Sequence, residues 1–247
     1  MTMLDAANEL FAVSDVLAGQ PMLRRSLSDP SARPEQRLEL ARRLFGSRIG
    51  PEAMSVLERV VGSPSSSPVE LRRGLEREGV VAALQSARDE GSLERVTTEL
   101  HGIGSAAAGS AELTTTLRSA AYELDAKRGL VDRLLGERAH PVTRLLASRA
   151  VQGHRRTFSA TVEDYLETAA ELADVVVAKV TVARPLDQGR LDRLRNALSA
   201  QVGRPVTLQV DIDPSVIGGI DVAIGHDVYE STVAGRLDDV RRQLINS

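Results

Sequence analysis

The first two thirds of the chain contain the same residue pattern twice, and the second copy follows ninety residues after the first without a gap. The matched residues include Leu, Gly, Pro and Arg, and among them are those that end or begin helices. The pairs include Leu10 and Leu100, Gly19 and Gly109, Leu27 and Leu117, Gly46 and Gly136, Pro51 and Pro141, and Arg59 and Arg149. Chance similarity of Leu-rich helices is the alternative, but register kept through Gly, Pro and Arg favours duplication. A solenoid usually needs three or more stacked repeats, and this chain has two copies, so we predict two similar helical bundles.

Helical spacing of apolar residues continues to about Ala173. Leu10, Val13, Val16 and Leu17 form one such stripe, which ends near Gly19 and Pro21. Pro51 suits the first turn of a later helix, because a proline lacks the amide that would be unpaired there. The polar stretch 62–68, rich in Ser and Pro, is the clearest break and is interpreted as a loop between modules.

The pattern changes to strands from about Asp174. Val175 to Ala183 is rich in β-branched residues, and Pro205 to Ile212 alternates apolar and polar residues. Between them lies a helix that starts near Asp187 and stops at Gly203. A third strand, Ile220 to Ile224, follows the turn at Gly218 and Gly219, and helical spacing returns beyond Gly235.

The predicted fold is therefore mainly α, with a small C-terminal α/β domain whose short sheet is backed by two helices. We divide the chain into an additional helical module (1–67), a second helical module (68–173) and the α/β domain (174–247). With 42% hydrophobic and 26% charged residues over 247 positions, the chain can bury a core.

The composition also excludes several classes of function. A net charge of −3 gives no electrostatic footprint for nucleic acid, and the absence of Cys excludes disulfides and thiolate chemistry. The first residues carry Asp5 and Glu9 without a basic segment, unlike a secretory signal. The sequence contains no run of eighteen apolar residues, which a membrane span would need, so no direct membrane insertion is expected.

Candidate chemistry is sparse. Gly218 and Gly219 lie between strands rather than at the start of a helix, which favours a turn over a phosphate cradle. The histidines lack metal-ligand spacing and are interpreted as surface or cap residues: His101, His140, His154 and His226. We therefore predict no catalytic, cofactor or metal site.

Two charged groups leave alternatives open. Asp211, Asp213 and Asp221 could form a carboxylate cluster for Ca²⁺ or acid–base work, but solvated sheet edges are favoured. Arg155 and Arg156 could bind a partner's carboxylate, although a basic helix end is the simpler interpretation.

The C-terminal motif Asp213-Pro214-Ser215-Val216-Ile217-Gly218-Gly219-Ile220, followed by Gly235-Arg236-Leu237, resembles the signature of the delta subunit of F-type ATP synthases. The mitochondrial form is called the oligomycin-sensitivity-conferring protein. Ser231 stands where this family commonly has Gly, so the turn there is expected to differ. Residues 79–87 occupy the place of the family's first helix, which implies that an ordinary member begins near residue 69.

Residues 1–67 would then be an addition, as in the enlarged delta subunits of actinobacteria, where delta can be fused to a membrane-anchored b-type segment. The sequence leaves open whether this chain is naturally separate or derived from such a fusion.

The resemblance implies a non-catalytic stator of the peripheral stalk, at the cytoplasmic face of the membrane and without cofactors. The helical part would hold the N-terminal segments of α subunits of the catalytic head, through a groove between bundle helices. The expected contacts lie on the helices at 79–89 and 142–152, at Ala83, Leu84, Ala87, Leu145 and Leu146.

The C-terminal part would hold the b-type stalk subunit. The expected contacts there are Ile217, Gly218, Gly219, Ile220, Leu237 and Leu244.

Two other classes of function remain as alternatives. A helical scaffold or adaptor outside the ATP synthase would have the same periodicity, and a pull-down of α and b-type subunits would distinguish it. An enzyme with a site between bundle and sheet would need a convergent set of ionisable groups, which the sequence does not show.

Overall fold

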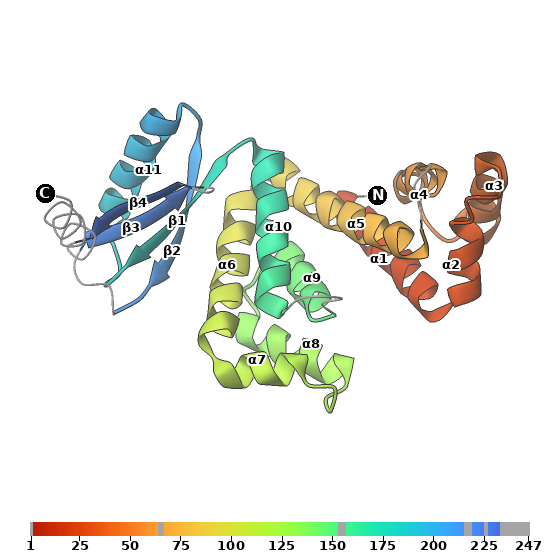
Figure 1. Ribbon diagram of the computed structural model, residues 1–247, viewed down its shortest axis with the longest axis horizontal. Coiled ribbons are helices and arrows are strands. Elements are labelled where there is room, and N and C mark those ends of the chain that lie inside the picture. Colours follow the sequence, from red (N-terminus) through yellow and green to blue (C-terminus); the bar gives the residue numbers. More distant parts are fainter. Residues whose placement is uncertain (1, 64–66, 153–156, 215–218, 225–226, 233–247) are drawn as a thin grey trace, which may run out of the picture.

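The computed structural model describes residues 2–63, 67–152, 157–214, 219–224 and 227–232. The molecule is elongated, with a sheet at one end, a helical bundle in the middle and further helices at the other end (Figure 1). The described residues are mainly helical, with a small C-terminal α/β part, which confirms the predicted fold class.

Five helices form the first copy of the repeat. They are α1 (Met3–Gly19), α2 (Pro21–Leu27), α3 (Pro34–Phe45), α4 (Pro51–Gly62) and α5 (Pro68–Asp89). Four of them begin at a proline, in the position that needs no amide partner. The N-termini of α1 and α5 are fixed by capping boxes, in which Thr2 exchanges hydrogen bonds with Asp5 and Ser67 exchanges them with Glu70.

The next five helices repeat this layout ninety residues later. They are α6 (Leu93–Gly109), α7 (Ala111–Arg118), α8 (Leu124–Leu135), α9 (Pro141–Ala150) and α10 (Phe158–Ala173). The first residues of α1, α3, α4 and α5 each differ by ninety from those of α6, α8, α9 and α10. The repeat therefore includes α5 as the counterpart of α10, which the sequence comparison did not reach.

Helix α5 belongs to both copies. It packs along α1 and also contacts α6, α9 and α10. Its second half is almost continuously buried from Gly79 to Ala87, and one hydrophobic core runs from Ala6 to Ala169. The predicted module boundary after residue 67 thus coincides with the start of a helix, while the core continues across it.

The junction of α5 and α6 is held by a serine. Ser92 stands at the N-cap position of α6, but its hydroxyl donates to the Ala87 carbonyl at 3.1 Å instead of accepting from the helix. The serine therefore ties the end of α5 to the start of α6.

The C-terminal part is a four-stranded sheet in the order β2-β1-β3-β4. Its elements are β1 (Val176–Val182), α11 (Gln188–Val202), β2 (Val206–Ile212), β3 (Gly219–Ile224) and β4 (Asp227–Thr232). Strands β1 and β2 are parallel, and the other pairs are antiparallel. The predicted strands are present, but β4 was not expected, and the predicted closing helix lies outside the described residues.

Helix α11 covers one face of the sheet. Asp187 accepts from the Arg190 amide at its start, and Gly203 ends it with a φ of 73°. Ala178, Val180 and Val182 of β1 pack in a small core with Leu198 of α11. The alternate residues of β1 and β2 face away from this core, on the side where α6 and α10 contact the sheet.

Candidate partner-binding surfaces

The residues predicted to form a groove on the helical part are largely enclosed. Ala83, Leu84 and Ala87 of α5 and Leu146 of α9 are fully buried, whereas Leu145 is partly buried. The four buried side chains are covered by neighbouring residues in this structure, and direct contact between them and a partner stays a prediction. They pack these helices against their neighbours. More exposed residues on the same helices would make any contact with a partner.

The predicted C-terminal contacts fall in two groups. Ile217, Gly218, Leu237 and Leu244 lie outside the described residues. Gly219 begins β3, and Ile220 lies opposite Val182 of β1 and Ser231 of β4. Ile220 is partly buried against the core of the sheet.

A buried arginine joins three helices at the place where the groove was expected. The Arg149 side chain on α9 is 6% exposed, and its Nε donates to Glu76 Oε2 of α5 at 2.9 Å. Its Nη1 donates to Asp15 Oδ2 of α1 at 2.8 Å, and a further bond joins Nη2 to Glu76. The guanidinium also lies 4.8 Å from the ring centre of Phe11.

The charge of Arg149 is stabilised in spite of its position. Burial opposes the charged form, but the hydrogen bonds that Arg149 donates to Glu76 and Asp15 outweigh it and raise the pKa of Arg149 above its ordinary value. Burial also raises the pKa of the nearby Tyr165, and the negative charge of Glu76 adds to this effect. Both residues therefore keep one protonation state, which suits a structural role rather than acid–base chemistry.

Helices α1 and α5 approach closely beside this cluster. A Cβ added at Gly79 would lie 2.6 Å from the Phe11 ring, so only glycine fits without movement. Ser14 of α1 donates to Glu76 Oε1 at 2.6 Å one turn away. These contacts fix α1 against α5 over the face that carries Arg149.

The two copies share one further interaction. The Glu9 carboxylate accepts from the Gly50 amide at 2.9 Å, and the Glu99 carboxylate accepts from the His140 amide at 2.8 Å. Each glutamate thus binds the residue that precedes the fourth helix of its own copy. His140 also accepts from the Val142 amide, which agrees with the expected cap role for this histidine.

Polar contacts join the helical part to the sheet. Ser105 Oγ donates to Asp211 Oδ1 at 2.7 Å, and His101 Nε2 lies 3.2 Å from the same oxygen. Lys179 of β1 pairs with Glu163 of α10, and Arg195 of α11 lies 3.5 Å from Glu94 of α6. Asp211 is therefore only partly solvated: its side chain is 44% exposed, and its carboxylate also contacts α6.

A cavity of about 670 Å³ lies beside these contacts, between α6, α10, α11 and β2. Its walls include Leu93, Leu166, Ala169, Leu191 and Leu208. The junction is thus made of a few polar pairs around an open, mostly apolar space. The predicted arginine pair at 155–156 lies outside the described residues.

The described residues do not contain a group of three or more His, Asp or Glu side chains placed to hold a metal ion. Within the same part of the chain, each helix is too short or too polar to cross a bilayer.

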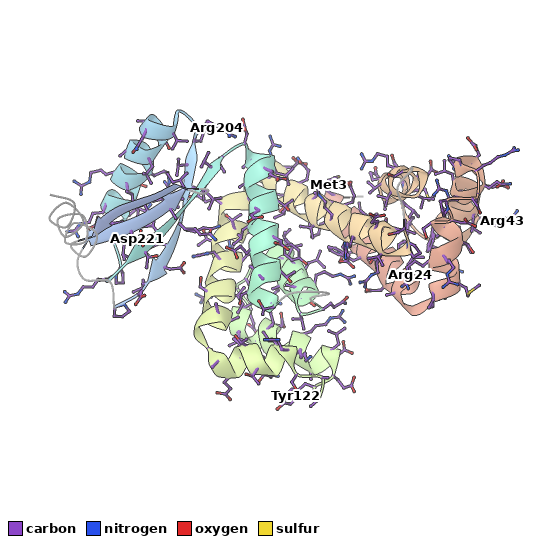
Figure 2. The ribbon with its side chains drawn as sticks, in the orientation of Figure 1. Met3, Arg24, Arg43, Tyr122, Arg204 and Asp221 are labelled. Atoms are coloured by element: carbon purple, nitrogen blue, oxygen red, sulfur yellow. The ribbon has the colours of Figure 1, made fainter. Side chains whose placement is uncertain are left out.

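Large apolar side chains are exposed on or beside α8. They are Tyr122, Leu124 and Leu134, and Figure 2 shows Tyr122 at the lower end of the molecule.

A family model described as the ATP synthase delta (OSCP) subunit matches residues 80–244. The match begins within α5, at the half of this helix that packs against α9 and α10. It continues through the second helical copy and into the C-terminal part, so it covers both kinds of structure in the chain.

Several curated proteins named ATP synthase subunit delta are similar over most of the chain. The protein from Nocardioides sp. is 39% identical over 238 residues, which is 96% of this chain and 86% of that protein. The one from Streptomyces coelicolor is 37% identical over 239 residues, with 96% and 87% coverage. The one from Cutibacterium acnes is 36% identical over 238 residues, with 96% and 90% coverage.

These alignments are long enough that they must include most of the first helical copy as well. A chain in a cryo-EM structure of the Toxoplasma gondii mitochondrial ATP synthase hexamer is 22% identical, with a TM-score of 0.35, 67% coverage of this chain and 95% of that one.

Proposed function

Because the chain belongs to the ATP synthase delta (OSCP) family, we propose that it is a non-catalytic stator subunit of an F-type ATP synthase. The observation that supports this most is the span of the family match, which covers the second helical copy and the sheet together. The chain would connect the catalytic head to the peripheral stalk, at the cytoplasmic face of the membrane, without inserting into it.

The structure suits a subunit that bears load between two partners. A stator has to resist the torque of the rotor, so it needs firm contacts at both ends rather than a reactive centre. The helical part is held together by one core and by the Arg149 cluster, which joins α1, α5 and α9. The sheet lies at the opposite end of the molecule from α3 and α4 (Figure 1).

The partners we propose are the N-terminal segments of α subunits for the helical part and the b-type subunit for the C-terminal part. On the helical part, Leu145 remains our candidate contact among the predicted residues, because it is the one that is partly accessible. On the C-terminal part, the candidates remain 217–220 together with Leu237 and Leu244.

The proposal is tested by binding each partner separately. The full chain is mixed with the isolated catalytic head and, in a second experiment, with the soluble part of a b-type subunit. We expect stable complexes with both, and Leu145→Asp should weaken only the complex with the head. Binding to neither partner would exclude the stator role and favour an adaptor outside the ATP synthase.

A further inference from the structure

The fourth helices of the two copies are equivalent in sequence position but differ in what covers them. Helix α9 is buried on two sides. One side packs within its own copy, and the second side consists of Val142, Leu146, Arg149 and Ala150. The ninety-residue counterparts on α4 are Glu52, Val56, Arg59 and Val60. All four are exposed or partly exposed, and the Arg59 side chain is 66% exposed.

Helix α5 accounts for this difference. It lies against α9 and α10, and Glu76, near the middle of α5, neutralises Arg149. The described residues place no equivalent helix against α4 and the first half of α5. The surface of the first copy formed by α4 and the first half of α5 is therefore equivalent to the surface of the second copy that α5 covers. In the first copy this surface is not covered by a described helix.

A groove marks this surface. It has a volume of about 370 Å³ and lies between α4 and α5, with Arg59 and Val60 on one wall and Leu71 on the other. Its floor is at Gly74, where an added Cβ would lie 2.9 Å from Val60. Arg59 donates to Glu78 at 2.8 Å along the groove, on the side open to solvent.

We propose that the α4–α5 groove binds an amphipathic α-helix of a partner protein, in the way that α9 and α10 hold the second half of α5. The inference does not depend on the partners named under the proposed function. The bound helix would present small and apolar residues to Val60, which is partly exposed in the groove. A carboxylate on the helix would bind Arg59, as Glu76 binds Arg149.

Helix-in-groove recognition fits these dimensions because an amphipathic helix buries one apolar face and leaves its polar face in water. The rim carries Arg59, Glu70 and Glu78, so it has both signs of charge. A partner carboxylate would compete with Glu78 for Arg59 and set the direction in which the helix lies.

The test uses the full chain and a synthetic peptide with the sequence of residues 75–89, which is the internal example of such a helix. Binding is followed by methyl NMR of the Val and Leu side chains. We expect saturable shifts centred on Val60 and Leu71, and the peptide variant Glu76→Arg should bind more weakly.

Val60→Glu is the groove variant, and Val16→Glu is its control, since Val16 is an exposed valine on α1 outside the groove. Val60→Glu should weaken peptide binding by about tenfold or more, because the carboxylate would be buried against the apolar side of the peptide. Val16→Glu should bind as the unmodified chain does. Thermal unfolding of both variants checks that the fold is kept.

Three outcomes would overturn the proposal. The first is no saturable shift at Val60 and Leu71, and the second is equal binding by Val60→Glu and Val16→Glu. The third is a concentration-dependent dimer that Val60→Glu abolishes, since the occupant would then be a second copy of this chain.

Discussion

Arg149 and Arg59 hold equivalent positions in the two copies but have different surroundings. Arg149 is enclosed by three helices and bonded to Glu76 and Asp15, while Arg59 is 66% exposed and bonded to Glu78. A buried pair loses more when one partner is removed, because the other charge remains without solvation. The same residue type at the same repeat position is therefore expected to have very different effects on stability.

Arg149→Met should destabilise the chain by about 3–5 kcal/mol, because Glu76 is left partly buried without its counter-charge. Arg59→Met is the matched control and should cost below about 1 kcal/mol, as expected for an exposed pair. Urea unfolding of both variants checks the difference. Equal effects would contradict the structural role of the Arg149 cluster.

Glu99 gives a pH-dependent prediction. Burial raises the pKa of Glu99, but bonds from Thr143, His140 and Arg95 outweigh it and hold the pKa below its ordinary value of 4.5. The folded chain thus favours the ionised form, so this stabilisation is present above about 4.5 and is lost as the pH falls through the lower folded pKa.

Glu99→Gln should therefore be less stable than the unmodified chain at neutral pH, and the difference should narrow as the pH falls below 4.5. Thermal unfolding midpoints over this range measure it. Glu39→Gln serves as the control, since the Glu39 side chain is 75% exposed. A difference that stays constant with pH would contradict the assignment.

At the scale of elements, α5 is the helix on which the helical part depends. Its residues 68–83 are the counterpart of α10 and close the first copy, and the helix also lies against α9 and α10 of the second copy. Because both sets of contacts belong to one continuous helix, the two copies cannot move as independent bundles without breaking α5. The close approach at Gly79 fixes α1 onto this helix as well.

Gly79→Ala should destabilise the chain by about 1–3 kcal/mol, because the new methyl group meets the Phe11 ring. Gly102→Ala on α6 should have the opposite sign and stabilise by roughly 0.5–1 kcal/mol, since nothing lies near that Cβ and alanine favours a helix. Thermal unfolding of the two variants compares the signs. Stabilisation by both changes would show that α1 does not pack on α5 as described.

The sequence predicted elements well where local signals are strong. Pro51, Gly203 and the change of periodicity near Asp174 mark real helix ends and the first strand. It did not predict the shared role of α5, because apolar spacing on a helix does not tell which neighbours cover it. For the same reason Ala83 and Leu146 were expected in an open groove but are buried.

Strand β4 was missed for a different reason. Its sequence, Asp227 to Thr232, has few apolar residues, and it is the strand at one edge of the sheet. An edge strand forms through its backbone bonds to β3, so a weak apolar pattern is enough. Arg149 carried no sequence signal beyond its match with Arg59.

At the scale of the whole molecule, the junction between the two helical copies differs in firmness from the junction between the helical part and the sheet. The helical copies share one core, whereas the sheet meets α6 and α10 through polar pairs around a cavity of about 670 Å³. Exposed polar pairs contribute little each, so this junction should be the softer one. A subunit between a catalytic head under torque and a fixed stalk would use such a junction to adjust its angle.

Asp211→Ala combined with Lys179→Ala should loosen the junction, because it removes the bonds to Ser105 and Glu163. The chain has no native cysteine, so spin labels on two introduced cysteines, at the exposed Arg73 and Arg193, report one distance.

The distribution of that distance should broaden while the unfolding midpoint of the helical part stays unchanged. Removing the exposed pair of Glu39 and Arg43 on α3 should leave the distribution as it was. An unchanged distribution in the junction variant would contradict a soft joint.

Proton pumping by the assembled enzyme tests the central claim, that the chain is a mechanical tether, most directly. Membranes stripped of this subunit should hydrolyse ATP without building a proton gradient, because the unheld head then turns about the rotor instead of driving it. We predict that adding back the purified chain restores ATP-driven pumping and that residues 1–173 alone do not. If pumping is independent of the chain, the account of its function is contradicted.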